Sequence, residues 1–178
     1  LFPPPPADVY DLFIDNTRAV EYNEFCKEMR DVGFLDNATK ITWSASGRVG
    51  PFKERDFVTR VHYRSLPDGT LMVVNRAERT PEAEESDRYL RMEVFLGGSV
   101  IRPLPGHPNR TLYVTVGHVN PGGIADSRLG AMLMNAAAGT GPVKLIQKLR
   151  QCLTSSRPAA DEARYYIILH YIILYYII

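Results

Sequence analysis

The sequence is poor in cysteine and holds no residues at metal-ligand spacing. Cys26 and Cys152 lie far apart with no paired Cys or His near them, which argues against a disulfide scaffold and a structural zinc site. The 4 histidines show no spacing such as i and i+4 on a helix. We therefore expect no metal or other cofactor, and a reducing compartment fits this cysteine usage.

An excess of charge of one sign is also missing. The 21 Lys and Arg residues stand against 20 Asp and Glu residues, which gives a net charge of +1. A nucleic-acid backbone is held by a broad positive field, so we expect no nucleic-acid partner. With 45% hydrophobic residues, 178 positions suffice for one domain with a core but not comfortably for two.

Motifs of covalent catalysis and nucleotide binding are absent as well. The sequence has no Gly-x-Ser-x-Gly elbow, Cys26 has no base close to it in sequence, and 139–141 lack the Lys-Ser or Lys-Thr of a phosphate loop. Arg55-Asp56 could be a catalytic acid with a cationic partner, but at the beginning of a strand an ion pair or turn anchor is more typical. We predict that the protein is not an enzyme.

What is present is a long series of strands. Apolar residues recur with a period of two, and turn-forming runs such as Asp36-Asn37, Pro67-Asp68-Gly69 and 105–109 lie between neighbouring segments. This predicts an antiparallel meander with strands at 39–45, 56–66, 71–78, 89–104 and 112–119. The acidic segment 80–87 has no apolar anchor, which indicates an exposed connection and a candidate mobile flap.

Segments with helical spacing of apolar residues precede and follow these strands in the sequence. From Val9 to about Arg30 this spacing predicts two short helices, with Asp8 as a helix N-cap. A final helix begins at Asp126 or Ser127, and the Gly and Pro residues of 139–142 predict a kink or a fresh helix start. The class is α+β, a sheet packed on a C-terminal helix.

The two ends differ in composition from the rest. The first residue is Leu1 rather than Met, so the N-terminus looks incomplete, and 1–7 is a Pro-rich leader before a domain at 8–156. Residues 157–178 are a linker and a Tyr, Ile and Leu tail that is short for a bilayer span of about 20 residues and resembles an aggregation-prone strand. An appended non-native or read-through segment and a membrane or interface anchor both remain open, and we assign the tail no function.

Three segments, taken in order, resemble the StAR-related lipid-transfer (START) domain. The first has Asp15, Arg18, Tyr22 and Asn23 where the family commonly has Asp, Arg and a Trp-Asp pair. The second is Gly50-Pro51 followed by Arg55-Asp56-Phe57-Val58. The third runs from Tyr89-Leu90-Arg91-Met92-Glu93 through Ile101-Arg102-Pro103-Leu104 to Val119-Asn120-Pro121-Gly122-Gly123, and is similar to the ceramide-transfer branch.

The resemblance covers about Val9 to Leu153, the later two-thirds of such a domain. It implies a helix-grip fold, a curved antiparallel sheet around a long C-terminal helix, with the N-terminal helix and first strands missing. It also implies lipid binding and intermembrane lipid transfer through a hydrophobic tunnel gated by a loop and that helix. The partners would be a phospholipid, sphingolipid or sterol and, transiently, a membrane, and the location cytoplasmic or peripheral at membranes.

Strand alternation selects residues for the lipid-facing wall. Phe57, Thr59, Val61 and Tyr63 oppose Arg60, His62 and Arg64, while Leu90, Met92, Val94 and Leu96 oppose Arg91 and Glu93. Buried Thr and Tyr hydroxyls are candidate polar contacts for a headgroup. The expected lipid-binding set is Trp43, Phe57, Thr59, Val61, Tyr63, Met92, Val94, Tyr113, Thr115, Leu129, Met132, Ala136 and Val143.

The resemblance also implies where a buried acid and Arg pair would lie. The Arg position falls at Val61 and the acid position near Thr42, and both are uncharged here, which suggests a less polar ligand or other headgroup contacts. The strand pattern alone turns Ile41 and Trp43 inward instead. Gly97, Gly98 and Ser99 are expected to form a flexible interruption at the gate.

Two alternatives remain open. An enzyme on a related helix-grip fold, such as a cyclase or hydrolase of a hydrophobic substrate, would need an inward ionisable pair, and His118 lies opposite Tyr113 and Thr115 in the strand pattern. An interaction remnant that binds no lipid is the other, since a truncated sheet need not close around a cavity.

Overall fold

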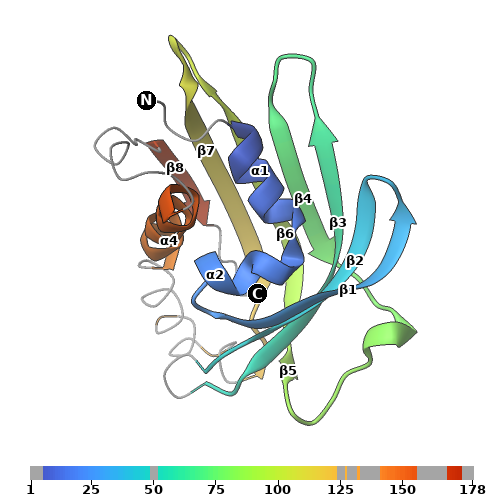
Figure 1. Cartoon of the computed structure of the whole chain (residues 1–178). Helices are drawn as coiled ribbons and strands as arrows, with labels where there is room; N and C mark the ends of the chain where they lie inside the picture. The colour runs from blue at the N-terminus through green and yellow to red at the C-terminus, as the bar shows by residue number, and fades with distance from the viewer. Residues whose placement is uncertain are drawn as a thin grey trace.

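A single sheet with helices over one of its sides forms the framework of the chain (Figure 1). The computed structural model describes residues 6–48, 52–123, 127, 132, 141–155 and 168–173. The elements in chain order are α1 (Pro6–Ile14), η1 (Asn16–Arg18), α2 (Ala19–Tyr22), β1 (Cys26–Asp36), β2 (Thr39–Ser46), β3 (Arg55–Ser65), β4 (Leu71–Ala77), η2 (Pro81–Ala83), β5 (Leu90–Arg91), β6 (Glu93–Leu104), β7 (His107–Asn120), α4 (Gly141–Ser155) and β8 (Ile168–Ile173).

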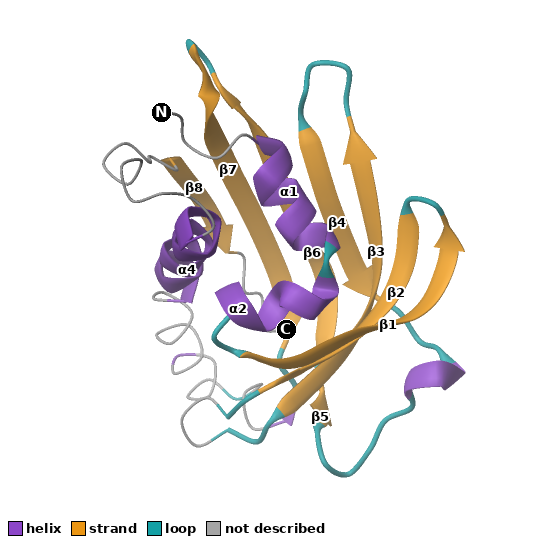
Figure 2. Ribbon diagram, in the orientation of Figure 1, coloured by secondary structure: helices purple, strands orange, loops and turns teal. Residues whose placement is uncertain are grey.

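The strands follow the predicted meander. Among the described residues the sheet has 8 strands in the order β1-β2-β3-β4-β6-β7-β8, and β5 is added beside β3 (Figure 2). Neighbours from β1 to β7 along this path pair antiparallel, whereas β5 with β3 and β8 with β7 pair parallel. The predictions for β2, β3 and β4 are confirmed to within one residue at either end.

The prediction of two short helices is confirmed by α1 and α2, but its extension to about Arg30 is wrong. Helix α2 ends at Tyr22 and β1 already begins at Cys26. Strand β1 lies at the edge of the sheet. Over much of its length it has two or more exposed residues for each partly buried one, and its pairing with β2 has three register shifts. An edge strand of this kind has little regular hydrophobic alternation, so its sequence carries a weak strand signal.

The single strand predicted at 89–104 is divided in two. Leu90 and Arg91 pair parallel with β3 as β5, and β6 begins at Glu93 beside β7. A register shift between Val94 and Leu96 follows, which breaks the two-residue alternation. The chain thus changes its pairing partner from β3 to β7 within a segment whose sequence contains no turn-forming residues that would indicate the change.

The helix boundaries also depart from the predictions. Helix α1 begins at Pro6, inside the expected leader, so Asp8 lies in the first turn rather than before it. Proline is favoured at such a position because its missing N–H has no partner there anyway. Helix α4 begins at Gly141, inside the segment 139–142 where a kink or a fresh helix start is predicted, while 139 and 140 and the expected helix start at Asp126 lie outside the described residues.

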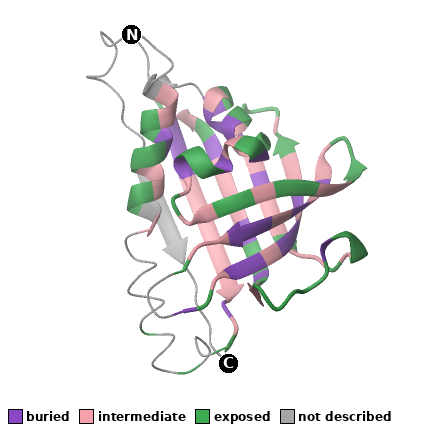
Figure 3. Ribbon diagram, turned by 60° about the horizontal axis from the view of Figure 1, so that its bottom comes forward, coloured by how far each residue is buried: buried purple, intermediate pink, exposed green. Residues whose placement is uncertain are grey.

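The core lies between the sheet and the helices. Helices α1, α2 and α4 lie over the same side of the sheet (Figure 1), and buried residues are most frequent on β2 and β3 (Figure 3). Two buried clusters join these layers: Val9, Ile101 and Tyr113 in one, and Leu12, Ala19, Tyr22 and Leu149 in the other.

We call the side of the sheet under the helices the inner face and the other side the outer face. Registers assign residues to each, because directly paired residues point the same way. The inner face holds Lys40, Thr42, Ser44, Phe57, Thr59, Val61, Tyr63, Leu71, Val73, Ser99, Ile101, Tyr113 and Thr115. The outer face holds Ile41, Trp43, Ala45, Asp56, Val58, Arg60, His62, Val74 and His118.

Candidate functional site

Four inner-face residues of β3 form a mostly apolar strip below the helices. Phe57, Thr59, Val61 and Tyr63 share this face, as the alternation predicts, and Thr59 and Val61 are buried. The Tyr63 ring meets Tyr10 of α1 edge to face, with 6.2 Å between ring centroids. Burial raises the pKa of the Tyr63 hydroxyl, so it stays neutral. The strip therefore offers hydrocarbon and neutral hydroxyl groups.

The hydroxyl groups predicted as headgroup contacts on β3 and β7 mostly have partners within the protein. Thr59 Oγ1 lies 3.0 Å from Thr42 Oγ1, and Thr115 Oγ1 donates to the Gly98 carbonyl at 3.0 Å. The Tyr113 hydroxyl lies 2.9 Å from Ser99 Oγ, and burial raises its pKa. To contact a ligand, these groups would share or exchange an existing hydrogen bond.

Ser44 is a polar inner-face residue that the sequence analysis missed. It is 2% exposed, and its Oγ has no hydrogen-bond partner among the described residues. It pairs across the sheet with Phe57 on one side and Met29 on the other. A buried hydroxyl without a partner is unfavourable in the unliganded protein, so a polar ligand atom beside it would be stabilised.

Trp43 lies on the outer face, so the prediction that it points inward is wrong. Its indole Nε1 donates to Asp56 Oδ2 at 2.9 Å, and the Arg30 guanidinium lies 5.1 Å from the ring centroid. A half-buried indole N–H needs an acceptor, and the Asp56 carboxylate on the same face supplies it. Trp43 is thereby removed from the candidate lipid-binding set, and Thr42 and Ser44 face inward in its place.

Asp56 is the centre of a structural network on the outer face. Arg91 donates to both of its carboxylate oxygens, each at 2.9 Å, and Asp56 itself is 2% exposed. Arg91 also donates to the carbonyls of Ala83 and Glu84 at 3.2 Å. The acidic connection expected to be a flap is therefore anchored to β3 through Arg91. Arg55, next to Asp56 in sequence, donates instead to the Pro121 carbonyl at 2.8 Å.

The inner face carries an ion pair that the sequence analysis did not foresee. Lys40 Nζ lies 3.1 Å from Asp31 Oδ1 and donates to the Ile14 carbonyl, at the end of α1, at 2.9 Å. A cation at a helix C-terminus is favourable, and Asp31 compensates its charge. Thr42 and Val61, the positions of the family's acid and Arg, both face inward and are uncharged.

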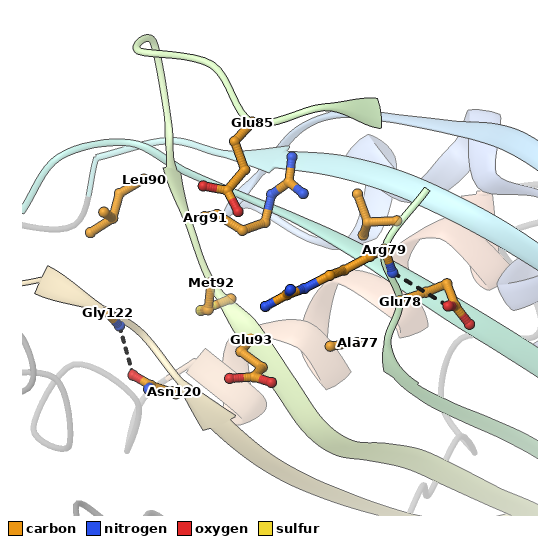
Figure 4. A pocket seen from close by; sticks show the side chains of 11 residues that line it. Ala77, Glu78, Arg79, Glu85, Leu90, Arg91, Met92, Glu93, Asn120 and Gly122 are labelled. Carbon is orange, nitrogen blue, oxygen red and sulfur yellow. Dashed lines mark hydrogen bonds between the residues drawn. The ribbon is translucent and has the colours of Figure 1, made fainter. Parts of the chain in front are cut away.

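The wall predicted on the β6 segment is only partly present. Val94 is buried opposite Val119, but Leu96 pairs with His118 on the outer face and is 48% exposed. Met92 lines a pocket of about 260 Å³ together with Leu90, Glu78, Arg79, Glu85, Arg91 and Glu93 (Figure 4). Charged residues surround this pocket, so Met92 does not belong to an apolar inner wall.

Glycines 97 and 98 lie within β6 and do not interrupt it. Gly97, Gly98 and Ser99 pair with β4 on one side and β7 on the other without a register shift, so the predicted flexible interruption is wrong. A Cβ on Gly97 would overlap the side chain of Asn75 on β4. Glycine here leaves room for the Asn75 side chain on the neighbouring strand, and a larger residue would require that side chain to move.

The structure describes only some of the residues expected on the core-facing side of the C-terminal helix. Leu129 and Ala136 lie outside the described residues. Met132 is 61% exposed and Val143 is 53% exposed, so Val143 is not on the buried side of α4. The residues of α4 that face the core are Leu145, Ile146, Leu149, Cys152 and Leu153. Val143 lies roughly a third of a turn from the centre of that stripe, which places it toward solvent.

His118 was the residue on which an enzymatic alternative depended. It pairs with Leu96 on the outer face, and its ring lies 4.8 Å from that of Phe95. The inner-face residues Tyr113 and Thr115 of the same strand point the other way. No observation therefore brings His118 and a carboxylate together on the inner face.

Comparison with known proteins identifies the architecture. A family model described as the START domain matches residues 1–159. The chain belongs to the START domain family. START domains bind lipids, and the α+β fold of this chain is their helix grip, a curved antiparallel sheet with a C-terminal helix. Members of the family generally bind ligands rather than catalyse reactions. No curated protein sequence matches this START domain.

Solved structures show the same fold at low sequence identity. Human STARD10 is 17% identical with a TM-score of 0.72, over 85% of this chain and 59% of that one. Human StAR-related lipid transfer protein 5 is 16% identical with a TM-score of 0.71, over 84% and 72%. The human StarD13 (DLC2) lipid transfer and protein localization domain is 20% identical with a TM-score of 0.69, over 86% and 73%.

Two further facts bound the functional conclusion. This START domain spans less than two-thirds of the STARD10 chain. In the part of the chain that the structure describes, no helix has the length and apolar character to cross a bilayer.

The outer-face network yields a stability prediction. Arg91→Met should lower the free energy of unfolding by about 3–5 kcal/mol, because it leaves the Asp56 carboxylate buried without its cation. Urea denaturation followed by circular dichroism measures this change. Arg18→Met, which removes an exposed pair with Glu21, is the matched control and should cost far less. Equal losses in the two variants would contradict the structural role of Asp56.

Proposed function

We propose that this START domain binds a single lipid between its inner face and its helices and transfers it between membranes. The observation that carries the proposal is the inner-face strip of β3 below α1, combined with membership of a lipid-binding family. The transfer step, the gate and a cytoplasmic or membrane-peripheral location are parts of the proposal. The cysteine usage noted above supports the location.

Transfer of a two-chain lipid through water requires an enclosed apolar surface. About thirty methylene groups at roughly 0.8 kcal/mol each would otherwise expose on the order of 25 kcal/mol of unfavourable hydration. Phe57, Val61 and Tyr63 supply hydrocarbon on β3, and Val94, Tyr113 and Thr115 extend the candidate surface across β6 and β7. We propose these residues, with Thr59, as the wall for the lipid.

The polar end of the lipid would be placed by hydroxyl groups. Ser44 offers the unpaired buried hydroxyl described above, with the Thr42 and Thr59 pair beside it on the same face. Lys40 is committed to Asp31 and to the end of α1, so it is poorly placed to neutralise a phosphate. We therefore propose that a neutral hydroxyl or carbonyl group of the lipid, rather than a phosphate, meets Ser44.

Helix α4 would act as the movable cover. It contacts the core through Leu145, Ile146 and Leu149, and its first residue is Gly141. Its packing contacts with α1, α2 and the inner-face residues Ile101 and Tyr113 are side-chain contacts rather than backbone pairing, so it can separate without breaking the sheet. We propose that contact with a bilayer favours this separation.

A matched pair of valine substitutions tests the inner face as the lipid site. Val61→Phe places a larger ring on the inner face, whereas Val74→Phe makes the same change on the outer face. Val61→Phe should cost about 1–3 kcal/mol of stability because Val61 is buried, and Val74→Phe, at a half-buried position, should cost no more. Lipid uptake from vesicles, measured by mass spectrometry of the repurified protein, should fall several-fold for Val61→Phe alone. Equal uptake by both folded variants would contradict the proposed location.

A second substitution tests the polar contact. Ser44→Ala should lower affinity for a sterol or diacylglycerol about fivefold, the effect of one neutral hydrogen bond. It should not lower the thermal midpoint of the lipid-free protein, because it removes a hydroxyl without a described partner.

Ser46→Ala is the control on the same strand, since the Ser46 hydroxyl already donates to the Arg55 carbonyl. A sterol whose hydroxyl is replaced by hydrogen offers no polar atom to Ser44 and should bind wild type and Ser44→Ala equally. If Ser44→Ala binds the hydroxylated and deoxy sterols, and diacylglycerol, as wild type does, Ser44 is not the polar contact.

A further inference from the structure

One edge of the sheet is covered by the end of the chain itself. Residues 112–117 of β7 pair in parallel with Ile168–Ile173 of β8, from Leu112 with Ile168 to Gly117 with Ile173 (Figure 1). The opposite edge of β7 pairs with β6 over almost its whole length. Among the described residues no strand other than β8 pairs with this edge of β7, a strand of 14 residues, so without β8 the backbone groups on this edge of 112–117 would have no partner among the described strands.

The parallel direction of β8 follows from the connection that leads to it. Parallel neighbours need a crossover of a dozen or more residues, usually with a helix, and 121–167 provides one that contains α4. Helix α4 packs against α1, α2 and the inner-face cluster of Tyr113 and Ile101. The unit β7, α4 and β8 is therefore a helical crossover that passes over the inner side of the sheet.

The composition of the tail fits a strand that must be paired. Residues 165–178 contain no Asp, Glu, Lys or Arg. An uncharged segment rich in β-branched and aromatic residues is a strong strand former, and an aggregation hazard when its backbone is free. Pairing with β7 satisfies the backbone of both strands at once.

We propose that Ile168–Ile173 is a built-in closing strand, which occupies the β7 edge within the same molecule and prevents that edge from pairing with a second copy. The occupant is this segment of the chain, and the surface is the β7 edge at 112–117. The proposal is independent of any ligand.

A cysteine pair tests the pairing in the full-length chain. Val114 and His170 are direct partners, so Val114→Cys with His170→Cys, in a Cys26→Ala and Cys152→Ala background, should form a disulfide within one molecule on mild oxidation. Asp68→Cys with His170→Cys is the control, because Asp68 lies in the turn between β3 and β4, and two strands separate β4 from β8. A monomer with a disulfide in the first pair alone supports the proposal. A disulfide between two chains, or none, overturns it.

Hydrogen exchange provides a second readout with its own control for folding. Deletion of 157–178 should speed hydrogen exchange, by roughly tenfold or more, at those amides of 112–117 that point toward β8 rather than toward β6. Amides of β2 and β3 should keep their protection. Light scattering should show self-association of the deleted form. Unchanged protection at 112–117 in the deleted form would overturn the proposal.

Discussion

The structure depends on covering one face of a twisted antiparallel sheet with helices that are held there mainly by side-chain packing. Leu149 of α4 meets Leu12 and Tyr22, while Val9 of α1 meets Ile101 and Tyr113 of the sheet. These contacts bury the inner face, and they also decide which residues can meet a ligand. A sheet held by backbone hydrogen bonds and a cover held by apolar contacts differ in how easily they separate, and lipid exchange requires such a difference.

The polar groups on the two faces serve different purposes. On the outer face, Asp56 joins Trp43 and Arg91 in a buried network that anchors the long connection between β4 and β6. On the inner face, Lys40 and Asp31 compensate each other at the end of α1. Ser44 differs from these groups because its hydroxyl has no partner among the described residues. The charged groups thus stabilise the protein, and a neutral group is available to a ligand.

Much of the fold follows from periodicity, because β2, β3 and β4 are regular strands with tight turns between them. The sheet, its antiparallel order and the facing of Phe57 to Tyr63 could be predicted this way. The predictions were wrong where pairing departs from regularity, at the exposed edge strand β1 and at the bulge after Val94. A bulge reverses the facing of every later residue, and hydrophobic alternation within one strand does not reveal it.

The candidate site was predicted less completely than the fold. Because Trp43 is large and apolar, strand alternation predicts that it faces inward. In the structure it lies on the outer face, where its N–H donates to the carboxylate of Asp56, 13 residues away in sequence. The neighbouring small residues Thr42 and Ser44 carry no hydrophobic signal, although the family resemblance placed a site position near Thr42. Tertiary partners of polar groups decide such positions, and these partners are distant in sequence.

The most direct test of the lipid site is photo-crosslinking with a lipid that carries a diazirine in its acyl chain, followed by peptide mapping. The account predicts adducts on inner-face residues of β3 and β7, such as Val61 and Tyr113, and none on outer-face neighbours such as His62. Adducts confined to the charged pocket around Met92 and Glu93, or to the outer face, would contradict it.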